Sequence, residues 1–249
     1  MNNFYLIVLA AGKGTRMGGT RPKVLRTIAG KPIIYWCLDL FTSIGMDNII
    51  VVVGYKSADV IKKISSYGFK VEFIKQNKQL GTAHSVRVAL KTVPEKIKNV
   101  FVVFGDDSAL YTKKTIKDFI SCHLKNRSKA TLMITKSGNS QSVGGLEINK
   151  KGQVVGVLQR GKEIRGGKKI VVLCGAFCFQ AKWIKEFIHQ VPKTKSSGEF
   201  PLPGIIAVAK MNKVRVNTFL LKNKIEWNSV NTTEELRQSQ VKKMSLLKL

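Results

Sequence analysis

The chain has 249 residues, of which 44% are hydrophobic and 8% aromatic, a composition typical of a packed globular protein rather than a disordered one. No apolar run reaches the ~18 residues of a membrane-spanning helix, and the N-terminus lacks the charged region and cleavage site of a signal peptide, so we expect no membrane partner and a cytoplasmic location. The net charge of +28 favours anionic ligands, such as phosphate esters or nucleic acid. Because the basic residues are spread along the chain, we expect no specific nucleic-acid partner.

Strand-like and helix-like segments alternate through the first half of the chain. Continuous apolar runs predict buried strands, and apolar residues at helical spacing predict helices. In chain order we expect a strand at 4–10, a helix at 33–44, a strand at 48–53, a helix at 57–67 capped by Ser57, a strand at 70–74, a helix at 82–90, a strand at 100–104, a helix at 112–124 and a strand at 130–135. This alternation predicts an α/β fold with a Rossmann-like, doubly wound and mostly parallel sheet.

The pattern changes after residue 136. Strand-like runs separated by Gly- and Lys-rich turns are followed by further helix-like segments. We expect strands at 144–148, 153–158, 170–179 and 214–220 and helices at 182–190 and 233–246. The chain therefore predicts one continuous domain, 1–249, with a small β-rich lobe after residue 136.

A glycine-rich loop follows the first predicted strand and reads Leu-Ala-Ala-Gly-Lys-Gly-Thr-Arg-Met from Leu9 to Met17. Such a turn can bring backbone N–H groups close to phosphates at the carboxyl end of a parallel strand. Lys13, Arg16 and Lys23 add cations that offset the charge of a triphosphate. The loop is neither a dinucleotide fingerprint, because Met17 stands at the third glycine position, nor a Walker loop, because no Gly-Lys-Ser/Thr closes it.

Further motifs follow in order: Gln-Asn-Lys-Gln-Leu-Gly-Thr-Ala-His at 76–84, Phe-Gly-Asp at 104–106, Gly-Glu-Phe at 198–200 and Val-Asn at 230–231. Together with the first loop, they resemble the signature of nucleotidyltransferases that activate sugar 1-phosphates. The likeness is closest to the uridylyltransferase domain of bacterial N-acetylglucosamine-1-phosphate uridylyltransferases. It implies an Mg²⁺-dependent reaction of UTP, or another NTP, with a sugar 1-phosphate. It also implies an NTP-binding half, 1–136, and a sugar-phosphate and metal half, 137–249.

The resemblance assigns a role to each candidate site residue. Arg16 and Lys23 would be catalytic and would hold the β- and γ-phosphates. Asp106 and Asn231 would bind Mg²⁺. The residues implied to bind the nucleotide are Leu9, Ala10, Ala11, Gly12, Lys13, Gly14, Gln76, Gln79, Gly81 and Thr82. The residues implied to bind the sugar are Gly145, Gln159 and Glu199.

The chemistry of several side chains favours these roles independently. The amides of Gln76 and Gln79 offer a donor and an acceptor together, as a base edge requires. Asp106 ends a buried strand, where a hard oxygen ligand suits Mg²⁺, and Asp107 is the alternative ligand. Two structural readings stay open: Thr82 could be a helix cap, and Asn231 could cap the last helix. No general base is expected, because a phosphate monoester is already anionic and His84 reads as a helix-face residue.

The likeness weakens at the sugar end. Gln159 stands where the family has a Glu, Leu173 where it has an Asn, and Pro203-Gly204 where it has Thr-Asp. Each lost hydrogen bond to a sugar is worth about 1–3 kcal/mol, so N-acetylglucosamine 1-phosphate is only the default substrate. A chain that ends at Leu249 has no room for the acetyltransferase domain of bifunctional relatives, so we expect the uridylyl step at most.

Three alternative functions stay open. The first is a cytidylyltransferase acting on a polyol or isoprenoid-precursor phosphate, which shares the first loop. The second is a catalytically silent binding or regulatory relative, and the third is a basic nucleic-acid-binding protein. The sequence predicts no oligomeric state.

Overall fold

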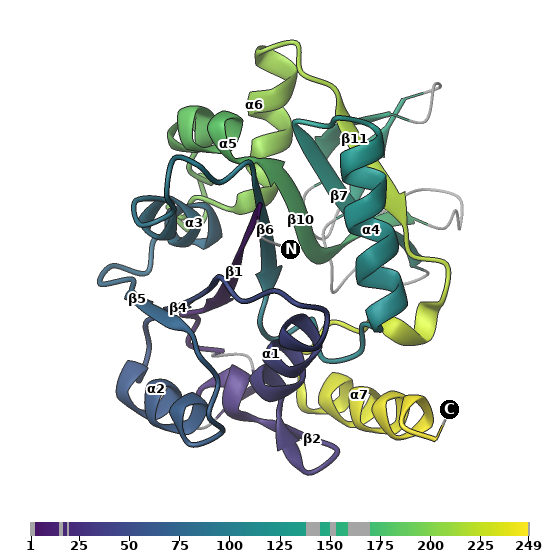
Figure 1. Ribbon diagram of the computed structural model, residues 1–249. Helices are drawn as coiled ribbons and strands as arrows, with labels where there is room; N and C mark the ends of the chain where they lie inside the picture. The colour runs from purple at the N-terminus through teal and green to yellow at the C-terminus, as the bar shows by residue number, and fades with distance from the viewer. Residues whose placement is uncertain are drawn as a thin grey trace.

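The computed structural model describes residues 3–14, 17–18, 20–137, 145–149, 153–158 and 170–248. The main strands are β1 (Phe4–Ala10), β4 (Ile49–Val53), β5 (Glu72–Lys75), β6 (Asn99–Phe104), β7 (Ala130–Ser137), β10 (Ile170–Gln180) and β11 (Val216–Leu220). They form one seven-stranded sheet in the order β11-β7-β10-β6-β1-β4-β5, seen at the centre of Figure 1. Two short strand pairs stand apart: β2 (Thr27–Ile28) with β3 (Lys31–Pro32), and β8 (Leu146–Ile148) with β9 (Val154–Val157).

Helices cover both faces of this sheet. They are α1 (Ile33–Ser43), α2 (Ser57–Ser65), α3 (Thr82–Leu90), α4 (Lys113–Lys125), α5 (Ala181–Phe187), α6 (Ile205–Met211) and α7 (Thr233–Leu246). The strand β1 shows why both faces of the sheet must be covered by helices: its alternate side chains are apolar on both faces and pack in two different hydrophobic cores. Leu6 and Val8 pack with α1, α2 and α4, whereas Ile7 and Leu9 pack with α3, α5 and α6. The predicted doubly wound α/β fold is confirmed.

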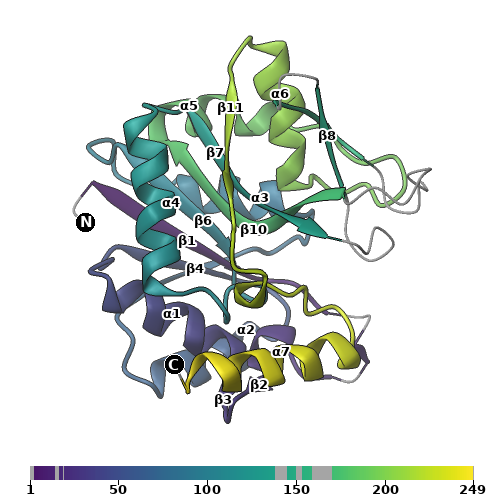
Figure 2. The ribbon, with the colours of Figure 1, turned by 90° about the vertical axis from the view of Figure 1, so that its right-hand side faces the viewer.

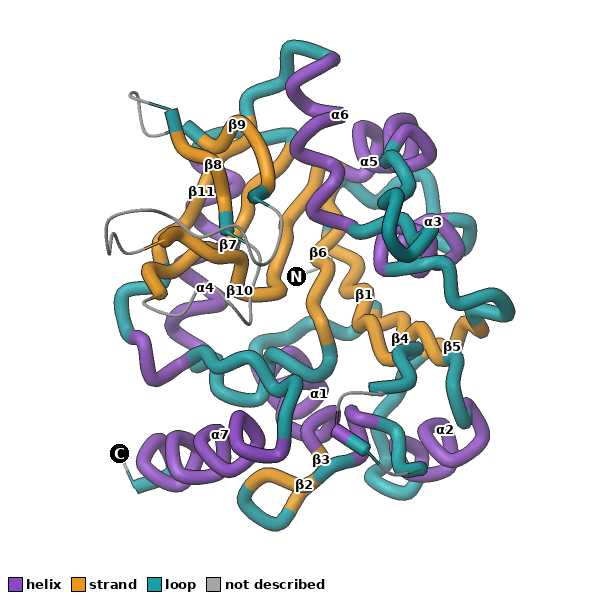
Figure 3. Tube along the Cα trace, turned by 180° about the vertical axis from the view of Figure 1, so that it is seen from behind, coloured by secondary structure: helices purple, strands orange, loops and turns teal. Residues whose placement is uncertain are grey.

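The sheet is mostly parallel, and β10 is the exception. The strands β1, β4, β5 and β6 run parallel, and β11 runs parallel to β7. Between β6 and β7, β10 pairs antiparallel with both. The segment 170–179 therefore belongs to the main sheet and not to the β-rich lobe in which the sequence had placed it. The pair β8–β9 lies beside α6 and β10, as Figure 3 shows from behind.

The predicted strand 214–220 likewise belongs to the main sheet, as β11. The remaining differences concern the ends of elements, the short pair β2 and β3, and one additional helix. Ser57 does not cap α2: the N-cap is Lys56, which has a left-handed φ of 47° and makes no side-chain cap bond. The helix α6 was not predicted, because its Ile-Ile-Ala-Val-Ala run is uniformly apolar. Figure 2 shows α7 beside β2 and β3, where Gln240 accepts a hydrogen bond from the Ala29 N–H at 2.7 Å. None of the helices in the described residues is long and apolar enough to cross a membrane.

Candidate active site

The glycine-rich loop and the Gly105–Asp107 turn meet at one edge of the sheet. Leu9 and Phe104 are paired in the β1–β6 register, and the Gly105 N–H donates to the Leu9 carbonyl at 3.0 Å. The end of β4 closes on the same loop, because the Tyr55 N–H donates to the Ala11 carbonyl at 3.1 Å. This edge carries the carboxyl ends of the parallel strands, which is where ligands bind in open α/β sheets.

Gly14 packs directly on Lys23. Its φ is +65°, and a Cβ added there would lie 2.8 Å from Lys23 Cβ. A larger residue would meet both backbone strain and a steric clash. The glycine therefore lets the loop close on the stem of the lysine, which opens the short 3₁₀ helix Lys23–Leu25.

Three side chains from distant parts of the chain converge here. The Lys23 ammonium forms an ion pair with the Asp106 carboxylate and donates to Asn231 Oδ1 at 3.2 Å. The Lys23 and Asp106 side chains are only 11% and 23% exposed, so solvent screens this pair less than a surface pair. The sequence predicted each of the three, and the structure brings them together.

The neighbouring carboxyl, Asp107, is less acidic than usual. Burial and the adjacent Asp106 carboxylate raise its pKa to about 7, against the opposing effects of Lys23 and the Val230 N–H. Its carboxylate lies beside Gly175 in β10, where an added Cβ would be 3.0 Å from Asp107 Oδ2. Asp106 is thus the carboxylate that faces Lys23, and Asp107 faces the sheet.

Asn231 is not the cap of the last helix. Thr232 is the N-cap of α7, in a capping box with Glu235. Glu235 also accepts from the Asn231 N–H at 2.6 Å and from Ser229 Oγ at 2.8 Å. The helix-cap reading of Asn231 is therefore wrong, and its carboxamide contacts Lys23 instead.

Residues that were not singled out in the sequence fix α7 against the loops that carry Asp106 and Asn231. Lys243 Nζ donates to the Ala109 carbonyl at 2.8 Å, on the loop after Asp106. Lys242 Nζ donates to the Trp227 carbonyl at 3.1 Å, before Asn231. Burial lowers the pKa of both lysines. A signal for Glu235 was present in the sequence, since Thr232 and Glu235 have the Thr-x-x-Glu spacing of a capping box.

The second predicted nucleotide loop contacts the first. Gln79 Nε2 donates to the Ala11 carbonyl at 3.1 Å. Gln76 is buried, with 3% of its surface exposed, and its Nε2 lies 3.1 Å from the Gly81 carbonyl and 2.9 Å from His84 Nδ1. The amide hydrogens of Gln76, and at least one of Gln79, are thus engaged within the protein.

Gly81 and Thr82 face the segment that contains Glu199. The N-cap of α3 is Gly81 with φ 96°, so Thr82 is not the cap. Thr82 Oγ1 instead accepts from the Leu202 N–H at 2.7 Å. A Cβ on Gly81 would lie 2.7 Å from the Phe200 carbonyl oxygen and 3.0 Å from Glu199 Cβ. Glu199, a predicted sugar residue, therefore adjoins the nucleotide loop.

The residues predicted to bind the sugar are described only in part. Gly145 bridges to Val172 of β10 and accepts from the Leu158 N–H at 2.8 Å. Val172 lies beyond the end of β6 in the β10 register, so Gly145 sits on the same edge of the sheet as Asp106. Gln159 and Arg16 lie outside the described residues.

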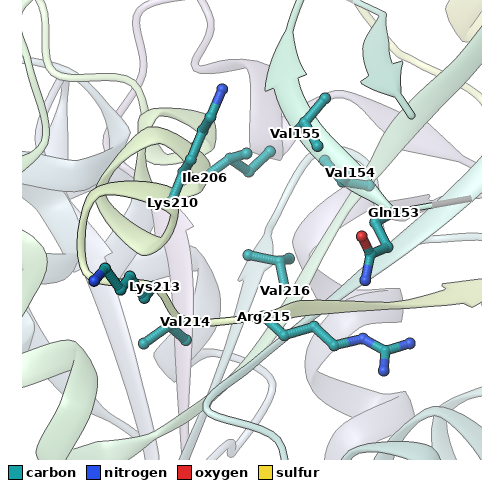
Figure 4. Close-up of a pocket in the computed structure, with 9 residues that line it drawn as sticks. All are labelled: Gln153, Val154, Val155, Ile206, Lys210, Lys213, Val214, Arg215 and Val216. Carbon is teal, nitrogen blue, oxygen red and sulfur yellow. The ribbon is translucent and has the colours of Figure 1, made fainter. Parts of the chain in front are cut away.

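A cavity of about 250 Å³ lies elsewhere, between β9, α6 and the start of β11 (Figure 4). Its lining residues are Gln153, Val154, Val155, Ile206, Lys210, Lys213, Val214, Arg215 and Val216. In Figure 4 the charged ends of the two lysines and the arginine point away from the valine and isoleucine side chains that line the cavity. None of the predicted site residues lines it, so it is separate from the candidate active site.

Comparison with known families decides the class of enzyme. The model of the MobA-like NTP transferase domain matches residues 6–171, which is more than half of the chain. The chain belongs to the MobA-like NTP transferase family. It is therefore a nucleotidyltransferase, as its motifs predicted.

Curated relatives of this MobA-like NTP transferase include the bifunctional protein GlmU of two bacteria. The GlmU of Clostridioides difficile (strain 630) is 28% identical over 240 residues, covering 96% of this chain and 51% of the relative. That of Halalkalibacterium halodurans is 29% identical over 241 residues, covering 96% and 52%. The chain thus spans about half the length of the curated relatives it matches.

Solved structures agree on the fold. HddC from Yersinia pseudotuberculosis superposes with a TM-score of 0.73 and is 22% identical, covering 95% of this chain and 98% of HddC. A second structure of HddC, complexed with GMP-PN, gives a TM-score of 0.71 at 21% identity. At this identity the match supports the architecture alone.

Proposed function

We propose that this MobA-like NTP transferase joins UTP and a sugar 1-phosphate, by default N-acetylglucosamine 1-phosphate, to give a UDP-sugar and pyrophosphate. The observation that carries the proposal is the convergence of Lys23, Asp106 and Asn231 beside the glycine-rich loop. The motif resemblance favours UTP, through the loop that holds Gln76 and Gln79. We also propose the division into an NTP-binding half, 1–136, and a sugar-phosphate and metal half, 137–249, within one domain.

The residues present fit Mg²⁺. The Lys23 ammonium already lies against a carboxylate oxygen of Asp106 and the amide oxygen of Asn231, so these two oxygens face a cation. Mg²⁺ takes one or two protein oxygens and completes its shell with phosphate oxygens and water. Asp106 and Asn231 would hold it, and when bound it would neutralise charge on the triphosphate.

The chain's own residues would act by alignment and charge. A phosphate oxygen of the sugar 1-phosphate attacks the α-phosphorus of UTP, and the α–β phosphoanhydride bond breaks with its electron pair leaving on pyrophosphate. The nucleophile is already anionic, so no side chain needs to remove a proton. Lys23 and Arg16 would stabilise the leaving pyrophosphate, and the loop Leu9–Gly14 would orient the triphosphate through backbone N–H groups.

Pyrophosphate release tests this function directly. Each of the four NTPs is combined with a panel of sugar 1-phosphates, with and without Mg²⁺. We expect turnover with UTP and Mg²⁺ and its loss on adding a chelator. Turnover only with CTP and a polyol or isoprenoid-precursor phosphate would favour the cytidylyltransferase. No turnover with any pair would favour a silent binding protein.

A further inference from the structure

The orientation of the Gln76 amide is determined by its surroundings. The Gly81 carbonyl, 3.1 Å from Gln76 Nε2, can only accept a hydrogen bond. The amide group that faces it must therefore be the NH₂ group and not the oxygen. The second amide hydrogen points to His84 Nδ1, at 2.9 Å.

His84 accepts this second hydrogen only when it is neutral with its proton on Nε2. Burial, with the nearby charges of Arg87 and Lys91, lowers the pKa of His84 and favours the neutral ring. The ring nitrogen that faces Gln76 then carries a lone pair. Both donors of the buried amide are thus engaged, and Oε1 is the part of the amide left for a ligand.

We propose that His84 determines base specificity by holding Gln76 with its acceptor oxygen toward the nucleobase. This inference rests on the proposed function. An acceptor at that position matches a base with a ring N–H, such as N3–H of uracil. It opposes cytosine, whose N3 is itself an acceptor. Rotation of the amide by half a turn would reverse this preference, and His84 together with the Gly81 carbonyl opposes that rotation.

His84 is a positioning residue, because it acts through Gln76 and not on the reacting atoms. If it served packing alone, its loss would weaken all nucleotides alike. If it orients the amide, its loss would narrow the ratio between UTP and CTP. The ratio of the two affinities therefore separates the two roles.

The experiment measures the binding of all four NTPs by calorimetry for the wild type and three variants. His84→Leu and His84→Ala remove the acceptor, and His84→Gln restores one through its amide oxygen. We expect the UTP/CTP affinity ratio to fall about tenfold in His84→Leu and His84→Ala, because leaving a buried donor unpaired changes an equilibrium constant by about that factor. In His84→Gln the ratio should recover. Thermal melting identifies any variant that does not fold.

The outcomes separate this inference from the proposed function. A wild type that prefers UTP, with an unchanged ratio or an equal loss of both nucleotides in His84→Leu and His84→Ala, overturns the role of His84 alone. A wild type that prefers GTP overturns the choice of UTP, and the GTP/ATP ratio then tests His84 in the same variants. A wild type that prefers CTP or ATP overturns both.

Discussion

The part of the site predicted to bind phosphate (the phosphate end) and the part predicted to bind the sugar (the sugar end) are built differently. At the phosphate end, the charged side chains of Lys23 and Asp106 meet the neutral amide of Asn231. Behind them, the loops are fixed by Glu235, Lys242 and Lys243. At the sugar end, Gly145 is held by backbone contacts beside a two-stranded sheet. Under the proposed function, the charged end binds a triphosphate whichever sugar is used. The departures from the family pattern at Gln159 and Leu173 concern positions predicted to bind the sugar.

The largest effect is expected at the ion pair. Lys23→Ala or Asp106→Ala should lower kcat at least ~100-fold, the scale of removing one preorganised electrostatic stabiliser. Pyrophosphate release measures it, with circular dichroism to verify the fold. Lys62→Ala, which removes an exposed lysine on α2, is the control for loss of one positive charge. Near-normal kcat in folded Lys23→Ala would remove the lysine from the mechanism.

The next effect is expected at Glu235. Glu235→Ala removes the acceptor of the Asn231 and Thr232 N–H groups, at 2.6 and 3.0 Å. Losing these hydrogen bonds costs about 1–3 kcal/mol and leaves Asn231, the proposed Mg²⁺ ligand, less well positioned. We therefore expect roughly tenfold lower kcat/KM and a higher Mg²⁺ concentration for half-maximal activity. The matched control is Glu234→Ala, on the same turn, whose carboxylate accepts a hydrogen bond from Gln238 on the same helix, at 3.3 Å. Equal Mg²⁺ dependence in the two variants would contradict the role of Glu235.

A third prediction concerns the junction between the two ends. Gly81→Ala places a Cβ against the Phe200 backbone at a φ of +96° and should separate the nucleotide loop from Glu199. We expect a severalfold rise in KM for both substrates, from a strain of about 1–3 kcal/mol. Gly68→Ala is the control, because Gly68 has a φ of +74° and no atom within 4 Å of the added Cβ. A rise in KM for one substrate only in Gly81→Ala would show that the phosphate end and the sugar end bind their substrates independently.

The smallest effect is expected at the sugar end. Glu199→Gln keeps the shape of an exposed side chain and removes its charge, so KM for the sugar 1-phosphate should rise about fivefold, from the loss of about 1 kcal/mol. Both kcat and KM for UTP should stay unchanged. Steady-state kinetics with each substrate varied in turn measures this split. The control Glu186→Gln removes the charge of an exposed carboxylate on α5 and should change neither kcat nor either KM. A lower kcat in Glu199→Gln would indicate that Glu199 acts on the reacting atoms.

Local patterns were sufficient to predict much of this enzyme. Asp106 follows an uninterrupted apolar run, and the carboxyl ends of parallel strands meet at one edge, so its proximity to the glycine-rich loop could be expected. Lys23 was predicted from the motif. Its contact with Asp106 could be expected because the glycine-rich loop and Asp106 lie at the same edge of the sheet.

Features that depend on longer range or finer geometry could not be predicted. Thr232 and Glu235 have the spacing of a capping box, but Asn231 and Glu234 have the same spacing, so only the side-chain geometry shows that Thr232 caps α7. The placement of β10 between β6 and β7 depends on strand order, which hydrophobic periodicity does not encode. The donors of Gln76 are engaged by residues whose orientation no spacing reveals. The roles assigned to the site residues stay predictions.

The central position of β10 has a consequence for biosynthesis. The strand β6 is complete at Phe104, but the neighbour that covers its outer edge begins at Ile170. On the ribosome, the first four parallel strands can assemble while the edge of β6 is unpaired, and β7 cannot join them until β10 has emerged. Delayed translation between these strands would prolong the exposure of that edge to other chains.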